Sequence, residues 1–193
     1  MMSPRISQSI ADSIAVKQAV LADPKLLSRI QQAADMITAS LQNGGKIHFC
    51  GNGGSAADAQ HLAAELSGRF YFDRSPLNAE ALHCNSSYLT ATANDYGYDE
   101  VFARLLQGTA KKGDVLVAIS TSGNSRNILK AIDMAAKLEV KTIALTGESG
   151  GAMGEYVDIL LNVPSTSTPR IQESHILMGH ILCEIVENTL FGQ

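Results

Sequence analysis

A histidine and a carboxylate lie one helical turn apart in the stretch AADAQHLAAELSG. His61 and Glu65 are four residues apart, so in a helix their side chains share one face. This spacing suits either a divalent metal ion or a pair of groups for general acid/base catalysis. A solvated Glu beside a partly buried His on a surface helix would have the same pattern. The pair by itself leaves these alternatives open.

Two loops of small residues have the composition of anion-binding loops. Gly51-Asn-Gly-Gly-Ser55 follows the apolar run KIHFC, and Ser120-Thr-Ser-Gly-Asn-Ser125 follows the apolar run DVLVAI. Small residues let the backbone approach a ligand, and hydroxyl and N–H groups at a helix start donate hydrogen bonds to an anion. Either loop alone could be a turn with a helix cap, but two of them at strand ends favour a phosphate site. Neither has the GxxxxGK[ST] or GxGxxG spacing of nucleotide-binding loops, so we predict a small phosphorylated metabolite as the ligand.

Polar residues also interrupt the apolar helix that we predict over residues 170–190. Gln172 and His180 lie among Ile, Leu and Met, where polar side chains are costly to bury without partners. In a helix the two residues are about 80° apart around the axis and roughly 12 Å apart along it. Both side chains of one helix would hardly reach a single ion. If both serve one site, we expect them to come from different subunits.

Five short apolar runs, separated mostly by helix-like segments, indicate how these residues are positioned. This alternation is typical of a parallel sheet with helices on both faces, which binds ligands at the carboxyl ends of its strands. Before the first strand, two amphipathic helices meet at Asp23-Pro24, and their apolar faces must pack across the sheet or against another chain. We therefore expect residues 1–44 to form a helical hairpin for packing or oligomerisation, and residues 45–193 to form one α/β domain. The expected strands are 46–50, 79–84, 114–120, 141–145 and 158–163, and the expected helices of this domain are 56–68, 99–110, 125–137, 150–156 and 170–190.

The composition excludes several classes of protein. With 193 residues and a formal charge of −4, the chain lacks the basic surface expected of a nucleic-acid-binding protein. It has neither the apolar core of a signal peptide nor the run of about 18 apolar residues that spans a membrane. The three cysteines are odd in number and without CxxC spacing, which is typical of a reducing compartment. We expect a cytoplasmic protein with no nucleic-acid or membrane partner.

Five stretches of the chain together resemble the sugar isomerase (SIS) domain family. They are GNGGSAADAQHLAAELSGRF, ATANDYGYDEVF, AISTSGNS, ALTGESGG and RIQESHILMGH, and the similarity covers nearly the whole chain. The resemblance implies a three-layer αβα sandwich with a five-stranded, flavodoxin-like parallel sheet. Within the family, the chain is similar to members that interconvert sedoheptulose 7-phosphate and D-glycero-D-manno-heptose 7-phosphate, the first step toward the ADP-heptose of the lipopolysaccharide core. These members are homotetramers with active sites at subunit interfaces, and many bind zinc, which implies one ion per subunit at an interface here.

The same resemblance implies roles for individual residues. It makes His61, Glu65, Gln172 and His180 the zinc ligands, with Glu65 and His180 also the acid/base pair of an isomerisation through an enediolate. One departure from the family pattern is Pro169, which stands where many members have an acidic residue, although proline is tolerated at a helix start. The implied substrate-binding residues are Asn52, Gly53, Gly54, Ser55, Glu65, Arg69, Asn94, Asp95, Ser120, Thr121, Ser122, Ser125 and Gln172.

Three other functions within the SIS family stay under consideration. A non-catalytic tetrameric adaptor that binds the bacterial replication initiator has an ending similar to EIVENTLF, but it lacks counterparts of Glu65 and His180, which this chain has. A sugar-phosphate-sensing regulator is disfavoured, because we see no DNA-binding extension before residue 46. An isomerase acting on an amino-sugar phosphate remains open, since the phosphate loops do not define the sugar.

Overall fold

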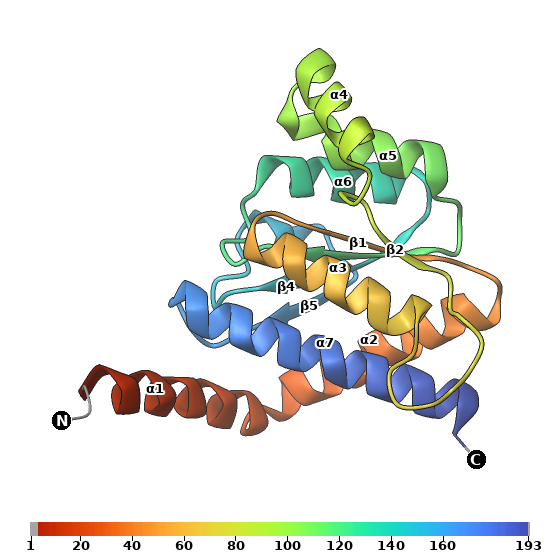
Figure 1. The fold of residues 1–193 in the computed structure, drawn as a ribbon. Coiled ribbons are helices and arrows are strands. Elements are labelled where there is room, and N and C mark those ends of the chain that lie inside the picture. The colour runs from red at the N-terminus through yellow and green to blue at the C-terminus, as the bar shows by residue number, and fades with distance from the viewer. Residues whose placement is uncertain (1–3, 193) are drawn as a thin grey trace.

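The computed structural model describes residues 4–192, which fold around a sheet of five parallel strands (Figure 1). The spatial order of the strands is β2–β1–β3–β4–β5. The strands are β1 (Ile47–Gly51), β2 (Ala79–Ala81), β3 (Val115–Ile119), β4 (Lys141–Thr146) and β5 (Ile159–Asn162). Every residue of β1 and β3 is buried, because helices cover both faces of the sheet. The predicted α/β fold with a five-stranded parallel sheet is confirmed.

β2 lies on one side of β1, and β3, β4 and β5 follow one another on the other side. The strand order therefore reverses between β1 and β3. β1 leads into α3 (Gly54–Ser67) on one face, and β3 leads into α6 (Arg126–Lys137) on the other. The register places Gly51 beside Ile119, so the two strands end next to each other. In open α/β sheets such a switch point leaves a crevice where ligands bind. Both Gly/Ser loops of the sequence begin at this point.

Helices from distant parts of the chain cover the two faces. α2 (Pro24–Gln42), α3 and α7 (Thr168–Phe191) pack on one face, and α5 (Val101–Thr109) and α6 pack on the other (Figure 1). The odd and even residues of each buried strand serve different cores, so Val117 faces the first layer and Leu116 the second. None of the helices within residues 4–192 combines the length and the hydropathy that crossing a bilayer requires.

The two predicted N-terminal helices are present as α1 (Pro4–Leu21) and α2. Asp23 caps α2, because its carboxylate accepts hydrogen bonds from the N–H groups of Lys25 and Leu26. In Figure 1, α1 reaches outward from the start of α2 instead of lying along it. Its apolar stripe therefore stays open to solvent within this chain: Ile6, Ile10 and Ile14 are 52%, 56% and 50% exposed.

The region between β2 and α5 differs from the sequence prediction. The strand expected over 79–84 ends at Ala81, and a helix that was not predicted, α4 (Ser86–Tyr96), follows it. Thr92 is the only buried residue of α4, so the apolar periodicity that reveals a packed helix is missing. Short 3-10 helices occupy Tyr98–Glu100 and Ala152–Glu155, the second in place of the helix predicted over 150–156.

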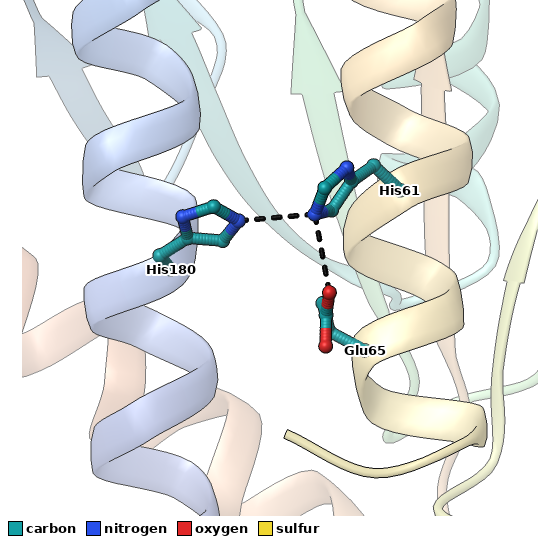
Figure 2. Close-up of side chains that lie close together, drawn as sticks. All are labelled: His61, Glu65 and His180. Atoms are coloured by element: carbon teal, nitrogen blue, oxygen red, sulfur yellow. Dashed lines mark hydrogen bonds and ion pairs between the residues drawn. The ribbon is translucent and has the colours of Figure 1, made fainter. Parts of the chain in front are cut away.

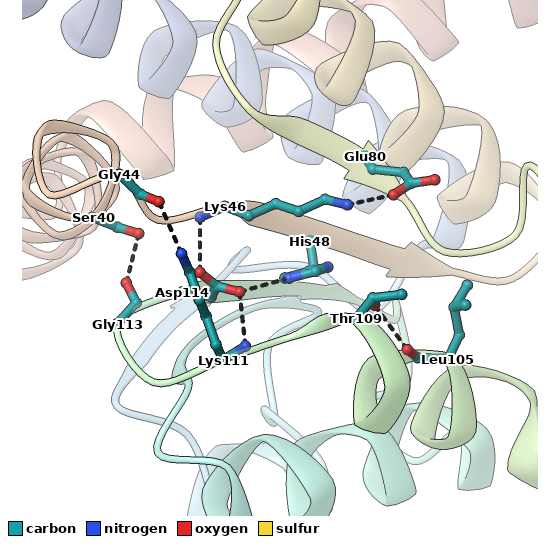
Figure 3. A network of polar contacts seen from close by, with 10 residues as sticks. All are labelled: Ser40, Gly44, Lys46, His48, Glu80, Leu105, Thr109, Lys111, Gly113 and Asp114. Carbon is teal, nitrogen blue, oxygen red and sulfur yellow. Dashed lines mark hydrogen bonds and ion pairs between the residues drawn. The ribbon is translucent and has the colours of Figure 1, made fainter.

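A polar network lies at the amino ends of β1 and β3, at the end of the sheet opposite to the two Gly/Ser loops (Figure 3). Asp114 is 1% exposed and accepts hydrogen bonds from the backbone N–H of Lys46 and of Lys111. Its second oxygen lies 3.1 Å from Nε2 of the buried His48. Burial lowers the pKa of His48, and the hydrogen bond with Asp114 opposes this effect. The network holds the strand starts together, far from the carboxyl ends where ligands bind.

Candidate active site

Three side chains converge between α3 and α7 (Figure 2). His61 and Glu65 project from α3, and His180 projects from α7. Nε2 of His61 lies 3.1 Å from Nε2 of His180 and 3.1 Å from Oε1 of Glu65. One ligand atom from each of the three residues lies within 4.8 Å of the others. Residues that are 119 positions apart in the sequence therefore face the same point.

The donor chemistry of this cluster fits a divalent metal ion. A neutral imidazole nitrogen carries either a proton or a lone pair, so Nε2 of His61 cannot satisfy both of its close neighbours well. A cation can accept lone pairs from all three atoms at once. Two histidines and one carboxylate with an open fourth position form a common catalytic zinc site. The side chains of His61 and Glu65 are 49% and 27% exposed, so a ligand can approach.

A glycine in α7 lets the two helices approach closely enough for this convergence. Gly179 precedes His180 and packs on Leu62, which follows His61. A β-carbon at Gly179 would lie 2.5 Å from Cδ1 of Leu62, closer than side chains pack. Gly costs helix stability relative to Ala, so its presence inside α7 is explained by the close contact with α3.

The second Gly/Ser loop gathers hydroxyl groups at the end of β3. Oγ of Ser120 lies 3.0 Å from Oγ of Ser125 and 3.4 Å from Oγ of Ser122. Neither α3 nor α6 has a side-chain hydrogen bond at its N-cap among the described residues. The first N–H groups of a helix point toward its open end and favour an anion. Hydroxyls and two helix starts therefore supply donors at the switch point of the sheet.

An asparagine pair joins the two loops. The side-chain amides of Asn52 and Asn127 exchange two hydrogen bonds of 2.9 Å each, and the Tyr98 hydroxyl donates to Oδ1 of Asn52 at 3.3 Å. Asn52 belongs to the first loop, and the buried Asn127 is the second residue of α6, which follows the second loop. Sequence reasoning missed Asn127 and Tyr98. The only available signal was the position of Asn127, two residues after Ser125.

A cavity of about 370 Å³ opens between the second loop and the start of α7. Six of its nine lining residues carry a hydroxyl group, which suits a polyol, because hydroxyls both donate and accept hydrogen bonds. Thr121 and Ser122, which were predicted from the sequence, contribute to it. The lining residues are Thr121, Ser122, Gly147, Glu148, Ser149, Ser165, Thr166, Thr168 and Ile171.

Gln172 belongs to α7, and its side chain packs against the start of α3. Its side-chain amide occupies the space where a β-carbon of Gly54 would be, so the contact requires a glycine there. Gly53, which precedes Gly54, has a φ of +56°, a conformation that favours glycine. Gln172 thus faces the first loop, whose Ser55 is buried.

The remaining predicted residues lie farther out. Asn94 and Asp95 are exposed on α4, which stands on the opposite side of the sheet from α7 (Figure 1). Arg69 is exposed in the loop after α3. The next residue, Phe70, was not predicted, and its ring centroid lies 5.8 Å from that of His180. On α4, Asn94 donates a hydrogen bond to Asp95, and no hydrogen bond within the described residues joins either of them to the cluster or to the loops.

The buried His175 of α7 serves the fold and makes stability depend on pH. Its Nε2 lies 3.0 Å from the carbonyl oxygen of Thr146, and burial lowers its pKa to about 4, an effect that this hydrogen bond opposes. Between pH 6.5 and 4 the unfolded chain therefore binds a proton that the folded chain does not, so stability falls as the pH falls. The loss attributable to His175 should total about 3 kcal/mol.

Urea unfolding at pH 7, 6, 5 and 4.5 checks this expectation. His175→Gln keeps a donor for Thr146 but cannot titrate, so its unfolding free energy should fall less steeply over this range than that of the wild type. Equal slopes for the two proteins would show that His175 is not the titrating group.

Comparison with known proteins gives a consistent result. Residues 10–147 match the SIS domain family. A protein of Mycobacterium bovis named phosphoheptose isomerase is 54% identical over 193 residues, which is 100% of this chain and 98% of the relative.

Two solved structures extend the similarity to the fold. A phosphoheptose isomerase from Neisseria gonorrhoeae has a TM-score of 0.90 and 45% identity, covering 95% of this chain and 97% of the other. A phosphoheptose isomerase from Francisella tularensis has a TM-score of 0.92 and 41% identity, covering 97% of this chain and 100% of the other.

Proposed function

This chain belongs to the SIS domain family, and from that premise we propose that it is a phosphoheptose isomerase. It converts sedoheptulose 7-phosphate to D-glycero-D-manno-heptose 7-phosphate, at the entry to ADP-heptose and lipopolysaccharide core synthesis. The observation that carries the proposal is the convergence of His61, Glu65 and His180 between α3 and α7, in a fold that brings two Gly/Ser loops to one switch point. Relatives of this name match 97% to 100% of the chain.

The residues of the cluster have the chemistry that an aldose–ketose isomerisation needs. In our proposal Glu65 removes a proton from C1 of the ketose, which leaves an enediolate, and returns the proton to C2. His180 moves a proton from O1 to O2, a role that suits imidazole because its unperturbed pKa is near neutrality. Oε1 of Glu65 and Nε2 of His180 both lie 3.1 Å from Nε2 of His61, so base and shuttle act on neighbouring atoms.

We propose that His61, Glu65 and His180 also hold one zinc ion per subunit. Bound there, the ion would polarise the substrate carbonyl as a Lewis acid. Gln172 faces the first loop of its own chain. We therefore propose that Gln172 reaches the ion from a neighbouring subunit.

The phosphate end of the substrate is assigned to the two loops. Ser55, Ser120, Ser122 and Ser125 would hold the phosphate, with the backbone of residues 52–54. Thr121 would contact the sugar in the hydroxyl-lined cavity. Arg69, Asn94 and Asp95 would complete the pocket, the last two from α4 of another subunit, because α4 lies across the sheet from α7 in its own chain.

We propose a homotetramer in the cytoplasm, with residues 1–44 as the oligomerisation element and residues 45–193 as the catalytic domain. The half-exposed isoleucines of α1 support this arrangement, since a second chain would bury them.

Incubation of the purified protein with sedoheptulose 7-phosphate, with and without added zinc, tests the function directly. Formation of the heptose 7-phosphate supports it. If no product forms in either condition, the isomerase proposal fails, and binding to the replication initiator becomes the assay for the adaptor alternative.

The Asn52–Asn127 pair leads to a prediction about substrate affinity. Asn127→Ala leaves the Asn52 amide without its partner and loosens the link between the two loops, at a cost of about 1–3 kcal/mol. We expect KM to rise roughly 10-fold, an effect equivalent to about 1.4 kcal/mol, with a smaller change in kcat. Steady-state kinetics check this, and Asn188→Ala, the same change at an exposed site near the end of α7, should behave as wild type. An unchanged KM for Asn127→Ala would contradict it.

A further inference from the structure

A buried carboxylate near the end of α7 binds the loop that follows α3. Glu187 is 1% exposed, and its two oxygens accept hydrogen bonds from the backbone N–H groups of Phe70, Tyr71 and Phe72, at 2.9, 2.5 and 3.1 Å. Nε of Arg74 donates to Oε1 of Glu187 at 2.8 Å. Burial acts to raise the pKa of Glu187, but the hydrogen bonds that it accepts lower it overall, so the carboxylate is ionised at neutral pH.

Besides Glu187, the guanidinium of Arg74 also binds the end of α3. It donates to the carbonyl oxygens of Glu65 at 3.0 Å, Leu66 at 2.9 Å and Gly68 at 3.0 Å. The last turn of α3 contains no basic residue of its own, and carbonyls at a helix end need donors. Arg74 therefore binds the backbone of Glu65 itself and, through Glu187, connects it to α7.

The same loop also touches the cluster from its other side. Phe70, whose N–H is held by Glu187, places its ring against His180, and the rings of His180 and His61 are 5.0 Å apart. Glu187 lies two turns after His180 on α7. The pair of Arg74 and Glu187 is thus joined to both helices that carry the cluster.

A buried ion pair gives little net stability over an apolar replacement, because its desolvation offsets its attraction. Both side chains of this pair are almost completely buried, at 2% and 1% exposure. What such a pair does provide is directional contacts, here to specific backbone atoms of α3 and of the loop. Its most specific consequence is the relative placement of α3 and α7.

We propose that Arg74 and Glu187 form a positioning pair that sets α3 against α7, so that His61 and Glu65 meet His180. This inference rests on the proposed function for its kinetic consequence. Neither residue belongs to the cluster of His61, Glu65 and His180, and the pair acts through the backbone of Glu65 and the ring of Phe70.

Glu187→Gln is the sharpest variant, because it keeps the shape and removes one acceptor oxygen. Each oxygen of Glu187 accepts two hydrogen bonds, so the amide would turn its NH₂ group toward two donors. Asp114→Asn is the matched control. It makes the same change in another buried carboxylate, 1% exposed, at the far edge of the sheet (Figure 3).

The experiment compares melting temperature, kcat, KM and zinc affinity of wild type, Glu187→Gln and Asp114→Asn. We expect both variants to melt at lower temperatures. Assayed well below its melting temperature, Glu187→Gln should lose about 100-fold in kcat, with little change in KM. Its zinc affinity should fall about 10- to 100-fold. Asp114→Asn should keep kcat and zinc affinity within about 2-fold of wild type, because distant sites act independently.

Two results overturn the proposal: wild-type kcat and zinc affinity in Glu187→Gln, or equal losses in both variants. If the wild type lacks isomerase activity, the proposed function fails, and the zinc titration still decides on the positioning pair. If the wild type binds no zinc either, crystal structures of the two variants decide whether Arg74 and Glu187 position the helices. The 3.1 Å separation of the Nε2 atoms of His61 and His180 should widen in Glu187→Gln and persist in Asp114→Asn. An unchanged separation in Glu187→Gln overturns the inference.

Discussion

Glu65→Gln is expected to lower kcat for sedoheptulose 7-phosphate by about 10²- to 10⁴-fold, the range that general acid/base groups contribute. Glutamine has the shape of glutamate but cannot take a proton from C1. The loss should therefore fall on kcat more than on KM. Because the carboxylate is 27% exposed and lies beside His61, the variant should fold as the wild type does. Circular dichroism and the melting temperature check the fold, and a coupled assay of the heptose 7-phosphate checks the rate.

A solvent-isotope experiment separates the proton transfer from other effects of this change. In D₂O a base that exchanges its proton with solvent introduces deuterium at C2 of the product, and Glu65→Gln should abolish this exchange together with turnover. Glu184→Gln provides the control, since it removes an exposed carboxylate from α7 one turn after His180. Full activity in Glu65→Gln would assign the base to another residue.

His61→Asn is expected to weaken zinc binding by at least 100-fold. Removing a residue that only hydrogen-bonds a metal ligand already lowers metal affinity about 10- to 100-fold. His61 offers a ligand atom itself, so its loss should cost at least as much. Its Nε2 is the atom that both Glu65 and His180 face at 3.1 Å, so no other side chain of the cluster can replace it. Isothermal titration with zinc after treatment with a chelator measures the change.

The stability of the protein gives a second readout of the same site. At a free zinc concentration of 100 times the dissociation constant, binding should raise the unfolding free energy of the wild type by about 2.7 kcal/mol. In His61→Asn the same concentration should have almost no effect. His83→Asn is the control, because His83 lies outside the cluster, and it should respond to zinc as the wild type does. A wild-type zinc response in His61→Asn would show that the ion binds elsewhere.

The sequence predicted the elements that carry strong local signals. Each buried strand is an apolar run, and the strand starts and ends differ from the prediction by at most one residue, except in β2. The helix from Arg126 to Lys137 was predicted almost to its ends. α4 escaped prediction because Thr92 is its only buried residue, and its apolar residues Leu89 and Ala93 are only partly buried, so the apolar period is weak. The Asn85 cap was its one local sign.

The chemistry of the site was also readable in part. The four-residue spacing of His61 and Glu65 follows from helix geometry alone, and parallel strands must end at one edge, which brings the two loops together. The sequence also marked Gln172 and His180 as unusual, because polar side chains in an apolar helix need partners.

Only the tertiary structure decided which partners those are. His180 meets His61 across 119 residues, while Gln172 faces Gly54 instead, because α7 crosses α3 in one register that Gly179 permits. The asparagine pair and the pair of Arg74 and Glu187 each join segments that are far apart in the sequence. No periodic pattern in the sequence indicates such contacts. Residue types and spacing along one element thus determined what chemistry this protein can offer. The packing of α3 against α7 determined where that chemistry is assembled, since hydrogen bonds and metal ligation act over about 3 Å, and a sequence does not specify such distances between separate elements.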